Sequence, residues 1–151
     1  MIWIGIDPGK KGGYAWISQD AYLNDRVVTK PFDENAFIAD MKTLAKGREE
    51  KRCCLEKVHS MPKQGVSSTF TFGSGYGFLK GVLETLDISY QEITPQRWKG
   101  EFGLNSDKQK SNEACKKLFP LVSLLPTARC KKDSDGMSEA LLMAEYARRK
   151  L

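Results

Sequence analysis

Four acidic residues stand at positions where the surrounding sequence is apolar, and carboxylates so placed are candidates for chemistry. They are Asp7, Glu56, Asp135 and Glu139. Asp7 ends the stretch MIWIGID, and Glu56 lies near the end of RCCLEKV, while Asp135 and Glu139 are four residues apart and so share one face of a helix. A set of oxygen donors without His or Cys suits Mg²⁺ or Mn²⁺. Two such ions about 4 Å apart can align a water and stabilise the leaving oxygen in phosphodiester hydrolysis.

Each acid also has a purely structural interpretation. Asp7 precedes a Pro-Gly pair, and Asp often initiates such a turn. Glu56 is followed by a lysine and can form a surface ion pair. Three residues can cap the last helix, where the helix dipole favours acids: Asp133, Ser134 and Asp135. The capping interpretation is weaker for Glu139, which lies one full turn further into the helix.

The elements that must position these acids follow from periodicity and from turn residues. Isoleucines alternate along 2–7, as in a strand, and further strands are expected at 12–18, 26–29, 52–58 and 89–93. Helices are expected at 33–46, 75–86, 106–118 and 136–150, with a long polar loop at about 60–77. This order predicts the α/β class, with a mixed five-stranded sheet flanked by helices and a single domain over residues 1–151.

Strand ends are where the first two acids would meet. Active sites of open α/β sheets lie beyond the carboxyl ends of the strands, and Asp7 and Glu56 both stand near such ends. If their strands are neighbours, two carboxylates come together, which is unfavourable unless one is protonated or a cation binds.

Positive charge is concentrated in one part of the chain. The formal net charge is +5, and residues 95–132 contain nine Lys or Arg but only three acidic residues. A localised basic surface is typical of nucleic-acid binding. The alternative is a solvated helix face without a polyanionic partner.

Cysteine usage and hydropathy indicate the compartment. The four cysteines, Cys53, Cys54, Cys115 and Cys130, form no CxxC pair, and the only histidine is His59, so we expect buried or half-buried reduced thiols rather than a zinc site. No apolar run approaches the roughly 20 residues that span a bilayer, and no secretion signal is apparent. We therefore expect a cytoplasmic protein without membrane contact.

The chain resembles the RuvC-like Holliday junction resolvases, in particular the short phage-type members, within the RNase H-like superfamily. The resemblance lies in four stretches that follow in order over nearly the whole chain: GIDPGKKGGYA, CLEKVHSMPKQGVSSTFTFGSGYGFLKG, ITPQRWK and DSDGMSEALLMAEYA. It implies an RNase H-like fold and a homodimer that binds four-way DNA junctions. It also implies paired symmetric cuts with Mg²⁺, for which Mn²⁺ can substitute, in the cytosol of a bacterium or of a phage-infected host. No P-loop or G-x-G-x-x-G spacing is present, so no nucleotide cofactor is expected.

The resemblance also implies roles for individual residues. Asp7 matches the catalytic aspartate of the first strand, Glu56 the glutamate of the central strand, and Glu139 the last helical acid. The family pattern places the remaining acid three residues before Glu139, where this chain has Gly136. Asp135 is then the nearest candidate, and Asp133 is the second.

Lysines and aromatic residues complete the implied site. Lys99 and Lys108 match basic residues near the scissile phosphate, where a lysine can stabilise the charge of the transition state. Phe70 and Phe72, expected on the loop, resemble the aromatic residue that stacks at the junction crossover, although at least one of them is expected to pack beneath the loop. The expected DNA contacts are Phe70, Phe72, Lys99, Lys108, Lys110, Lys131 and Lys132.

Other functions use parts of the same pattern. A broader structure-specific nuclease, acting on forks, flaps or replication intermediates, needs the same carboxylates. A non-catalytic junction-binding protein needs the basic surface but would bind DNA more tightly without the acids. An actin-like sugar kinase shares the opening D-P-G, but its two-domain nucleotide cleft needs far more than 151 residues.

Overall fold

A central strand that packs on both of its faces organises the sheet. The computed structural model describes residues 1–19 and 26–151. Strand β1 (Ile2–Asp7) pairs antiparallel with β2 (Gly13–Ser18) and parallel with β4 (Lys51–Glu56). Strand β3 (Arg26–Pro31) and strand β5 (Ser89–Ile93) form the edges, so the order is β3-β2-β1-β4-β5.

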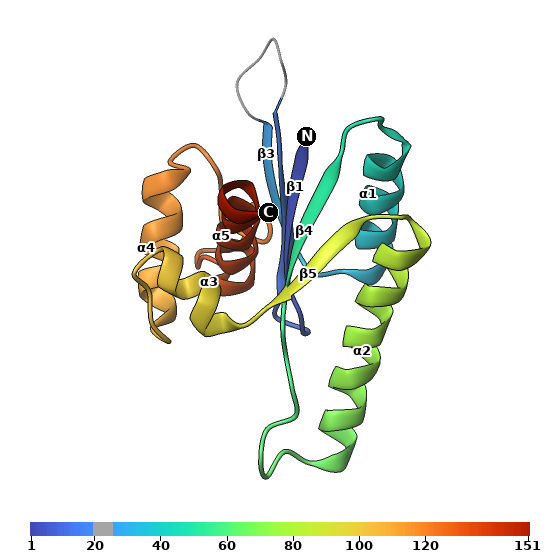
Figure 1. Ribbon diagram of the computed structural model, residues 1–151. Coiled ribbons are helices and arrows are strands. Elements are labelled where there is room, and N and C mark those ends of the chain that lie inside the picture. Colours follow the sequence, from blue (N-terminus) through green and yellow to red (C-terminus); the bar gives the residue numbers. More distant parts are fainter. Residues whose placement is uncertain (20–25) are drawn as a thin grey trace.

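One face of this sheet is covered by two helices, α1 (Glu34–Lys46) and α2 (Val66–Thr85), as Figure 1 shows. The isoleucines of β1 point to this side and are at most 6% exposed. They pack with Phe37 and Met41 of α1 and with Leu79 and Leu83 of α2. The alternation read from the sequence therefore gives the correct core face of β1.

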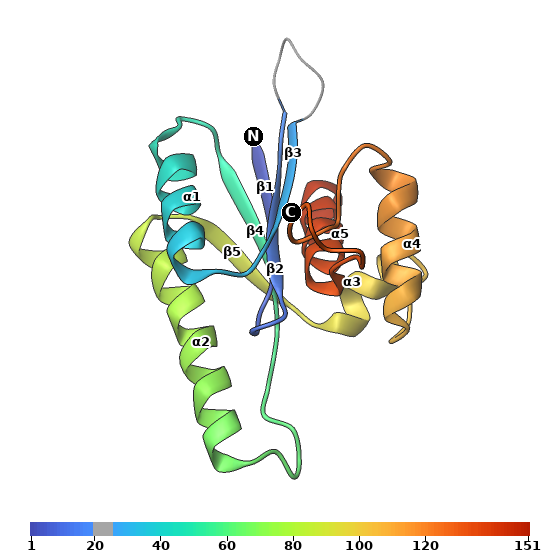
Figure 2. The same ribbon diagram turned by 180° about the vertical axis from the view of Figure 1, so that it is seen from behind.

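The other face is covered by α5 (Asp135–Lys150), with α3 (Pro95–Glu101) and α4 (Lys108–Leu118) outside it (Figures 1 and 2). Helix α5 lies directly on β1, because Gly5 presents no side chain to it. A Cβ atom at Gly5 would lie 2.1 Å from the carbonyl oxygen of Ala140. This close approach brings the first turns of α5 to the strand that ends in Asp7.

The predicted fold class, a mixed five-stranded sheet flanked by helices, is confirmed. The thiols of Cys53, Cys54 and Cys115 are free and buried, as expected, and that of Cys130 is free and half-buried. Within the described residues, no helix is both long enough and apolar enough to cross a membrane.

The largest error of the sequence analysis concerns residues 60–77, which were expected to form a loop. Helix α2 already begins at Val66, so Phe70 and Phe72 both lie on a helix. Glycines at 73, 75 and 77 each lower helix propensity by about 1 kcal/mol relative to alanine. Packing outweighs this cost, because Phe72, Tyr76, Leu79 and Leu83 recur at helical spacing and Leu79 and Leu83 are buried.

Two smaller differences affect the site. Strand β4 runs over Lys51–Glu56 rather than 52–58, so Glu56 is its last residue. Helix α3, seven residues long, was not expected, and it begins with Pro95 directly after the N-cap Thr94. Proline is well tolerated in the first turn of a helix, where its missing N–H has no partner to lose.

Candidate active site

The parallel pairing of β1 and β4 sets the carboxylates at the ends of these strands beside each other. Ile6 pairs with Leu55 as the last matched pair, and one residue further along each strand stand Asp7 and Glu56. Strand alternation turns both side chains to the face that α5 covers, the face to which Gly5 and Cys54 also belong. We expect these two acids to meet at the carboxyl ends of their strands, and the parallel pairing of β1 with β4 brings them together there.

A third carboxylate reaches the same place from α5. Glu139 is 6% exposed and lies in the part of α5, residues 136–147, that is buried throughout. Lys99 Nζ lies 2.8 Å from Glu139 Oε1, and Ser111 Oγ donates to the same oxygen at 3.4 Å. Helices α3 and α4 thus each supply one polar contact to this acid.

The pKa values of the two strand acids, Asp7 and Glu56, are raised by burial and by neighbouring carboxylates. Burial raises the pKa of Asp7 well above its ordinary value, and the charges of Glu56 and Glu139 raise it further. Burial likewise raises the pKa of Glu56, with Glu139 acting in the same direction, while a hydrogen bond from Trp98 opposes the increase. Three carboxylates close enough to disturb one another form a site that positive charge would stabilise.

Two lysines supply part of that charge. Lys99 and Lys108 both lower the pKa of Asp7 and of Glu56, because their positive charges favour the ionised carboxylates. The Lys99 side chain is 14% exposed, whereas that of Lys108 is 66% exposed. Lys108 is therefore free to contact an incoming anion, while Lys99 is held inside the cluster.

The two candidates for the fourth acid are placed differently. Asp135 lies in the first turn of α5, accepts a hydrogen bond from Asn112 Nδ2 at 3.0 Å and has Lys108 Nζ at 4.0 Å. Asp133 precedes the helix and forms an ion pair with Lys116. Ser134, which lies between them in the sequence, caps the helix, and its hydroxyl oxygen accepts from the N–H of Met137. Asp135 therefore shares Lys108 with the strand acids, and Asp133 points to another lysine.

Gly136 explains why this chain departs from the family pattern. A Cβ atom at this position would lie 2.3 Å from the carbonyl oxygen of Lys11 and 2.5 Å from the carbonyl carbon of Gly12. The start of α5 packs against the turn between β1 and β2 too closely for any side chain. An acid three residues before Glu139 is sterically excluded in this packing.

The donor chemistry of this cluster fits a hard divalent cation, since the acids contribute only carboxylate oxygens. Among residues 1–19 and 26–151, no three His, Cys, Asp or Glu side chains already stand as a closed metal-binding group. Instead, the Lys99 ammonium provides positive charge at Glu139. The acids that would hold a cation are Asp7, Glu56 and Glu139, with Asp135 beside them.

The expected DNA-contacting residues differ in exposure. Phe70 is 76% exposed, whereas Phe72 is half-buried, and a Cβ atom at Gly9 would lie 3.6 Å from its ring. Phe72 thus packs toward the turn that follows Asp7. The lysines at 110, 131 and 132 are exposed.

Three polar residues that contact the acids were not predicted from the sequence: Trp98, Ser111 and Asn112. Trp98 Nε1 donates to Glu56 Oε1 at 2.9 Å. Ser111 contacts Glu139, while Asn112 joins Asp135 to Ser138, whose hydroxyl donates to the Asn112 side-chain oxygen. Ser111 and Asn112 lie about one helical turn after Lys108, and this spacing on one helix could have pointed to them. Trp98 carried no such signal, because α3 itself was not expected.

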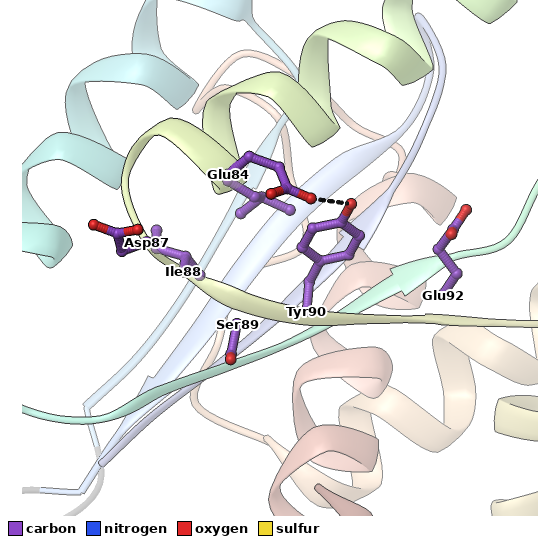
Figure 3. A pocket seen from close by; sticks show the side chains of 7 residues that line it. Glu84, Asp87, Ile88, Ser89, Tyr90 and Glu92 are labelled. Atoms are coloured by element: carbon purple, nitrogen blue, oxygen red, sulfur yellow. Dashed lines mark hydrogen bonds between the residues drawn. The ribbon is translucent and has the colours of Figure 1, made fainter.

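A groove at the β5 edge of the sheet has acidic side chains but, among the residues that the structure describes, no lysine or arginine in its lining, unlike the candidate site. It is lined by Leu83, Ile88, Ser89, Tyr90 and the acids Glu84, Asp87 and Glu92 (Figure 3). Tyr90 Oη donates to Glu84 Oε1 at 2.9 Å. Its acidic lining disfavours a phosphate backbone, so a DNA path across this edge is not favoured.

Comparison with known proteins points to one fold. No protein-family model matches the chain, and no curated protein is recognisably similar to it. Among solved structures, RuvC of Thermus thermophilus matches with a TM-score of 0.62 at 17% identity, over 99% of this chain and 96% of RuvC. The structure of T. thermophilus RuvC in complex with Holliday junction substrate matches with a TM-score of 0.63 at 15% identity, over 99% of this chain and 97% of that one. The resemblance read from the sequence is therefore confirmed at the level of the fold: this chain folds as RuvC does, in an RNase H-like arrangement.

Proposed function

We propose that this chain is a metal-dependent endonuclease that resolves four-way DNA junctions by paired, symmetric phosphodiester hydrolysis. The observation that carries the proposal is the convergence of Asp7, Glu56 and Glu139 at one end of the sheet, with Lys99 and Lys108 beside them. The fold match supports the choice of substrate, because a solved RuvC is described in complex with Holliday junction substrate.

The acids would hold the cofactor, with Asp7, Glu56, Glu139 and Asp135 as the donor groups. When bound, Mg²⁺, for which Mn²⁺ can substitute, supplies the charge that activates a water and stabilises the leaving oxygen. Burial of Asp7 and Glu139 excludes bulk water and strengthens the electrostatic interactions inside the site.

The lysines act on the substrate. Lys108 is exposed at the site and is suited to bind the phosphate that is cut. Lys99 lies within the acid cluster, where a fixed positive charge stabilises the negative charge that develops in the transition state. Lys110, Lys131 and Lys132 are exposed residues of the basic 95–132 segment and are suited to the flanking duplex arms.

A homodimer is part of this proposal, since two cuts related by symmetry need two sites. The face of α2 opposite to the core offers a surface for it. Gly73, Gly77 and Gly81 are exposed on this face at intervals of four residues. Small residues at this spacing allow close helix approach, and the N-terminal half of α2 projects beyond the sheet (Figure 1).

A substrate panel tests the proposal. A mobile four-way junction, a flap, a fork and a linear duplex with the same arm sequences are incubated with the protein in Mg²⁺ and in EDTA. We expect cleavage of the junction alone, only with the metal. Equal cleavage of flaps and forks would favour the broader structure-specific nuclease, and junction binding without cleavage of any substrate would favour the non-catalytic binding protein.

A further inference from the structure

The short helix α3 holds two different acids of the candidate active site with two successive residues. Trp98 Nε1 donates to Glu56 Oε1 at 2.9 Å, and Lys99 Nζ lies 2.8 Å from Glu139 Oε1. The Lys99 ammonium also lies 5.1 Å from the centre of the Trp98 ring. The Trp98 indole therefore contacts both Glu56 and Lys99, and Lys99 in turn contacts Glu139.

The fold places Trp98 at Glu56 by a short connection. Glu56 pairs with Ile93, the last residue of β5, and the N–H of Lys57 donates to the Ile93 carbonyl at 2.8 Å. Helix α3 begins two residues after Ile93, and Trp98 lies in its first turn, with its N–H donating to the carbonyl of Thr94 at 3.2 Å. The relative position of Trp98 and Glu56 is thus determined by the sheet itself.

The packing around Trp98 leaves its side chain little freedom. It is 0% exposed and belongs to the buried cluster between the sheet and α5. Glu101, one turn further along α3, forms ion pairs with Arg149 and Lys150 of α5, at 3.6 and 3.0 Å. A rigid donor of this kind fixes the direction of the group that accepts from it.

We propose that Trp98 is a positioning residue: its indole N–H holds Glu56 by Oε1 and so fixes the direction in which Oε2 is presented to a bound divalent cation. The inference rests on the proposed function for the identity of the cation. An indole can only donate, so it cannot itself bind the metal or move a proton from water. Its part is to keep one carboxylate in one orientation.

Spectroscopy tests the contact without reference to activity. The three tryptophans give three indole N–H signals in a ¹H–¹⁵N spectrum, which Trp→Phe variants assign. In Glu56→Ala we expect the Trp98 signal to move while the Trp16 signal, from the opposite face of the sheet, stays in place. In Glu56→Gln, which keeps an acceptor oxygen, the shift should be smaller. An unmoved Trp98 signal in Glu56→Ala would overturn the inference.

Metal binding and kinetics test the role. Trp98→Phe removes the donor and keeps a ring, and Trp3→Phe makes the same change in a residue that packs on the same cluster but touches no acid in any contact described above. We expect Trp98→Phe to weaken Mn²⁺ affinity, measured by calorimetry, and to lower kcat of junction cleavage, each about 10- to 100-fold. KM and junction affinity in EDTA should stay within about twofold, and Trp3→Phe should change none of these.

The outcomes separate this inference from the proposed function. Weakened Mn²⁺ affinity in a protein that cuts no junction would support the positioning role and overturn the function. Wild-type Mn²⁺ affinity and kcat in folded Trp98→Phe would overturn the role and leave the function standing, and a wild-type protein that binds no Mn²⁺ would overturn both. If Trp98→Phe does not fold, Trp98 is replaced by 3-benzothienylalanine, in a chain that has Phe at the other two tryptophan positions. This analogue has the shape of tryptophan but no N–H, so it removes the donor without leaving a cavity. The same outcomes then apply.

Discussion

Glu139 is a buried acid whose two polar contacts come from two other helices. It lies on α5, accepts from Ser111 of α4 and is paired with Lys99 of α3. Asp7 and Glu56 carry raised pKa values because burial and neighbouring carboxylates both disfavour their charged forms. Folding therefore maintains a set of acids that is electrostatically costly in itself, and such a cost is commonly retained where a site has a function.

Asp7 should separate binding from cleavage. We expect Asp7→Asn to lower junction cleavage in Mg²⁺ by at least about 100-fold, because a carboxylate that would bind the cation directly is removed. Removal of a residue that only orients such a carboxylate costs less, about 10- to 100-fold. Junction affinity in EDTA should be unchanged or tighter, since a charge that repels phosphate is lost. Gel-shift titration and a cleavage time course measure both. Wild-type cleavage by the variant would remove Asp7 from the site.

Asp135 and Asp133 provide a matched pair. Asp135 shares Lys108 with the strand acids, whereas Asp133 is paired with Lys116. We expect Asp135→Asn to reduce kcat by about tenfold or more, as for a group close to the metal, and Asp133→Asn to remain within about twofold of the wild type. Single-turnover cleavage measures the two rates, and a dead Asp133→Asn beside an active Asp135→Asn would reverse the assignment.

At the scale of residues, the sequence predicts the acids better than their partners. Apolar flanks and strand ends identify Asp7 and Glu56, and these depend only on local pattern. The exclusion of an acid at 136 depends on contact with Lys11 and Gly12, more than a hundred residues away, and no local pattern contains it. Asn112 and Trp98 are likewise defined only by tertiary packing.

Among the elements, α2 shows how packing overrides propensity. Its glycines lie on the solvent face, where a missing side chain loses no packing, while its apolar residues at helical spacing meet the core. The polar residues of 60–77 predict a loop, because the packing of the segment's apolar residues against the core is not visible in the local pattern. Helix α3 escaped notice because seven residues show too little periodicity to be recognised. The strands were predicted within two residues of their ends, because short apolar runs bounded by turn residues define them locally.

The two phenylalanines of α2 should differ in what their loss affects. Phe72→Ala should lower the free energy of unfolding by roughly 1–3 kcal/mol, less than the 3–5 kcal/mol of a fully buried ring, because its ring packs near Gly9. Phe70→Ala should change stability by no more than about 0.5 kcal/mol. If Phe70 stacks at the crossover, its loss should reduce junction opening by about tenfold, as expected for a stacking contact of about 1–3 kcal/mol.

Urea unfolding measures the stabilities, and 2-aminopurine fluorescence measures junction opening. A Phe70→Ala variant that opens and cuts junctions at the wild-type rate would exclude this residue as the wedge. A Phe72→Ala variant of unchanged stability would contradict the packing described for its ring.

Over the whole molecule, one basic segment and one acidic groove are the charged features that concern DNA. Nine Lys or Arg and only three acids lie in the 95–132 segment, while Glu84, Asp87 and Glu92 line the groove at the β5 edge. We expect DNA to contact the 95–132 segment rather than that groove. Phosphate contacts contribute affinity for any DNA and depend steeply on salt, so they do not distinguish a junction from a duplex.

Lys131 and Lys132 should therefore contribute affinity without selectivity. In the Lys131→Ala, Lys132→Ala double variant, affinity for junction and for duplex should fall by the same factor. The slope of log affinity against log salt concentration should decrease by about 1 per lysine. Fluorescence anisotropy across a salt series measures both, with Lys42→Ala, an exposed change on α1 at the opposite face, as control. A loss confined to the junction would mean that these lysines recognise structure.

The central claim is that two such sites act together on one junction, and a cruciform plasmid measures this directly. Two symmetric cuts within the lifetime of one complex convert the supercoiled plasmid into a linear molecule whose ends ligase can seal. Independent cuts release nicked circles instead. We predict linear product as the first product in Mg²⁺, with none in EDTA and none from Asp7→Asn. Nicked circles as the main product, or an uncut plasmid to which the protein is bound, would contradict the account.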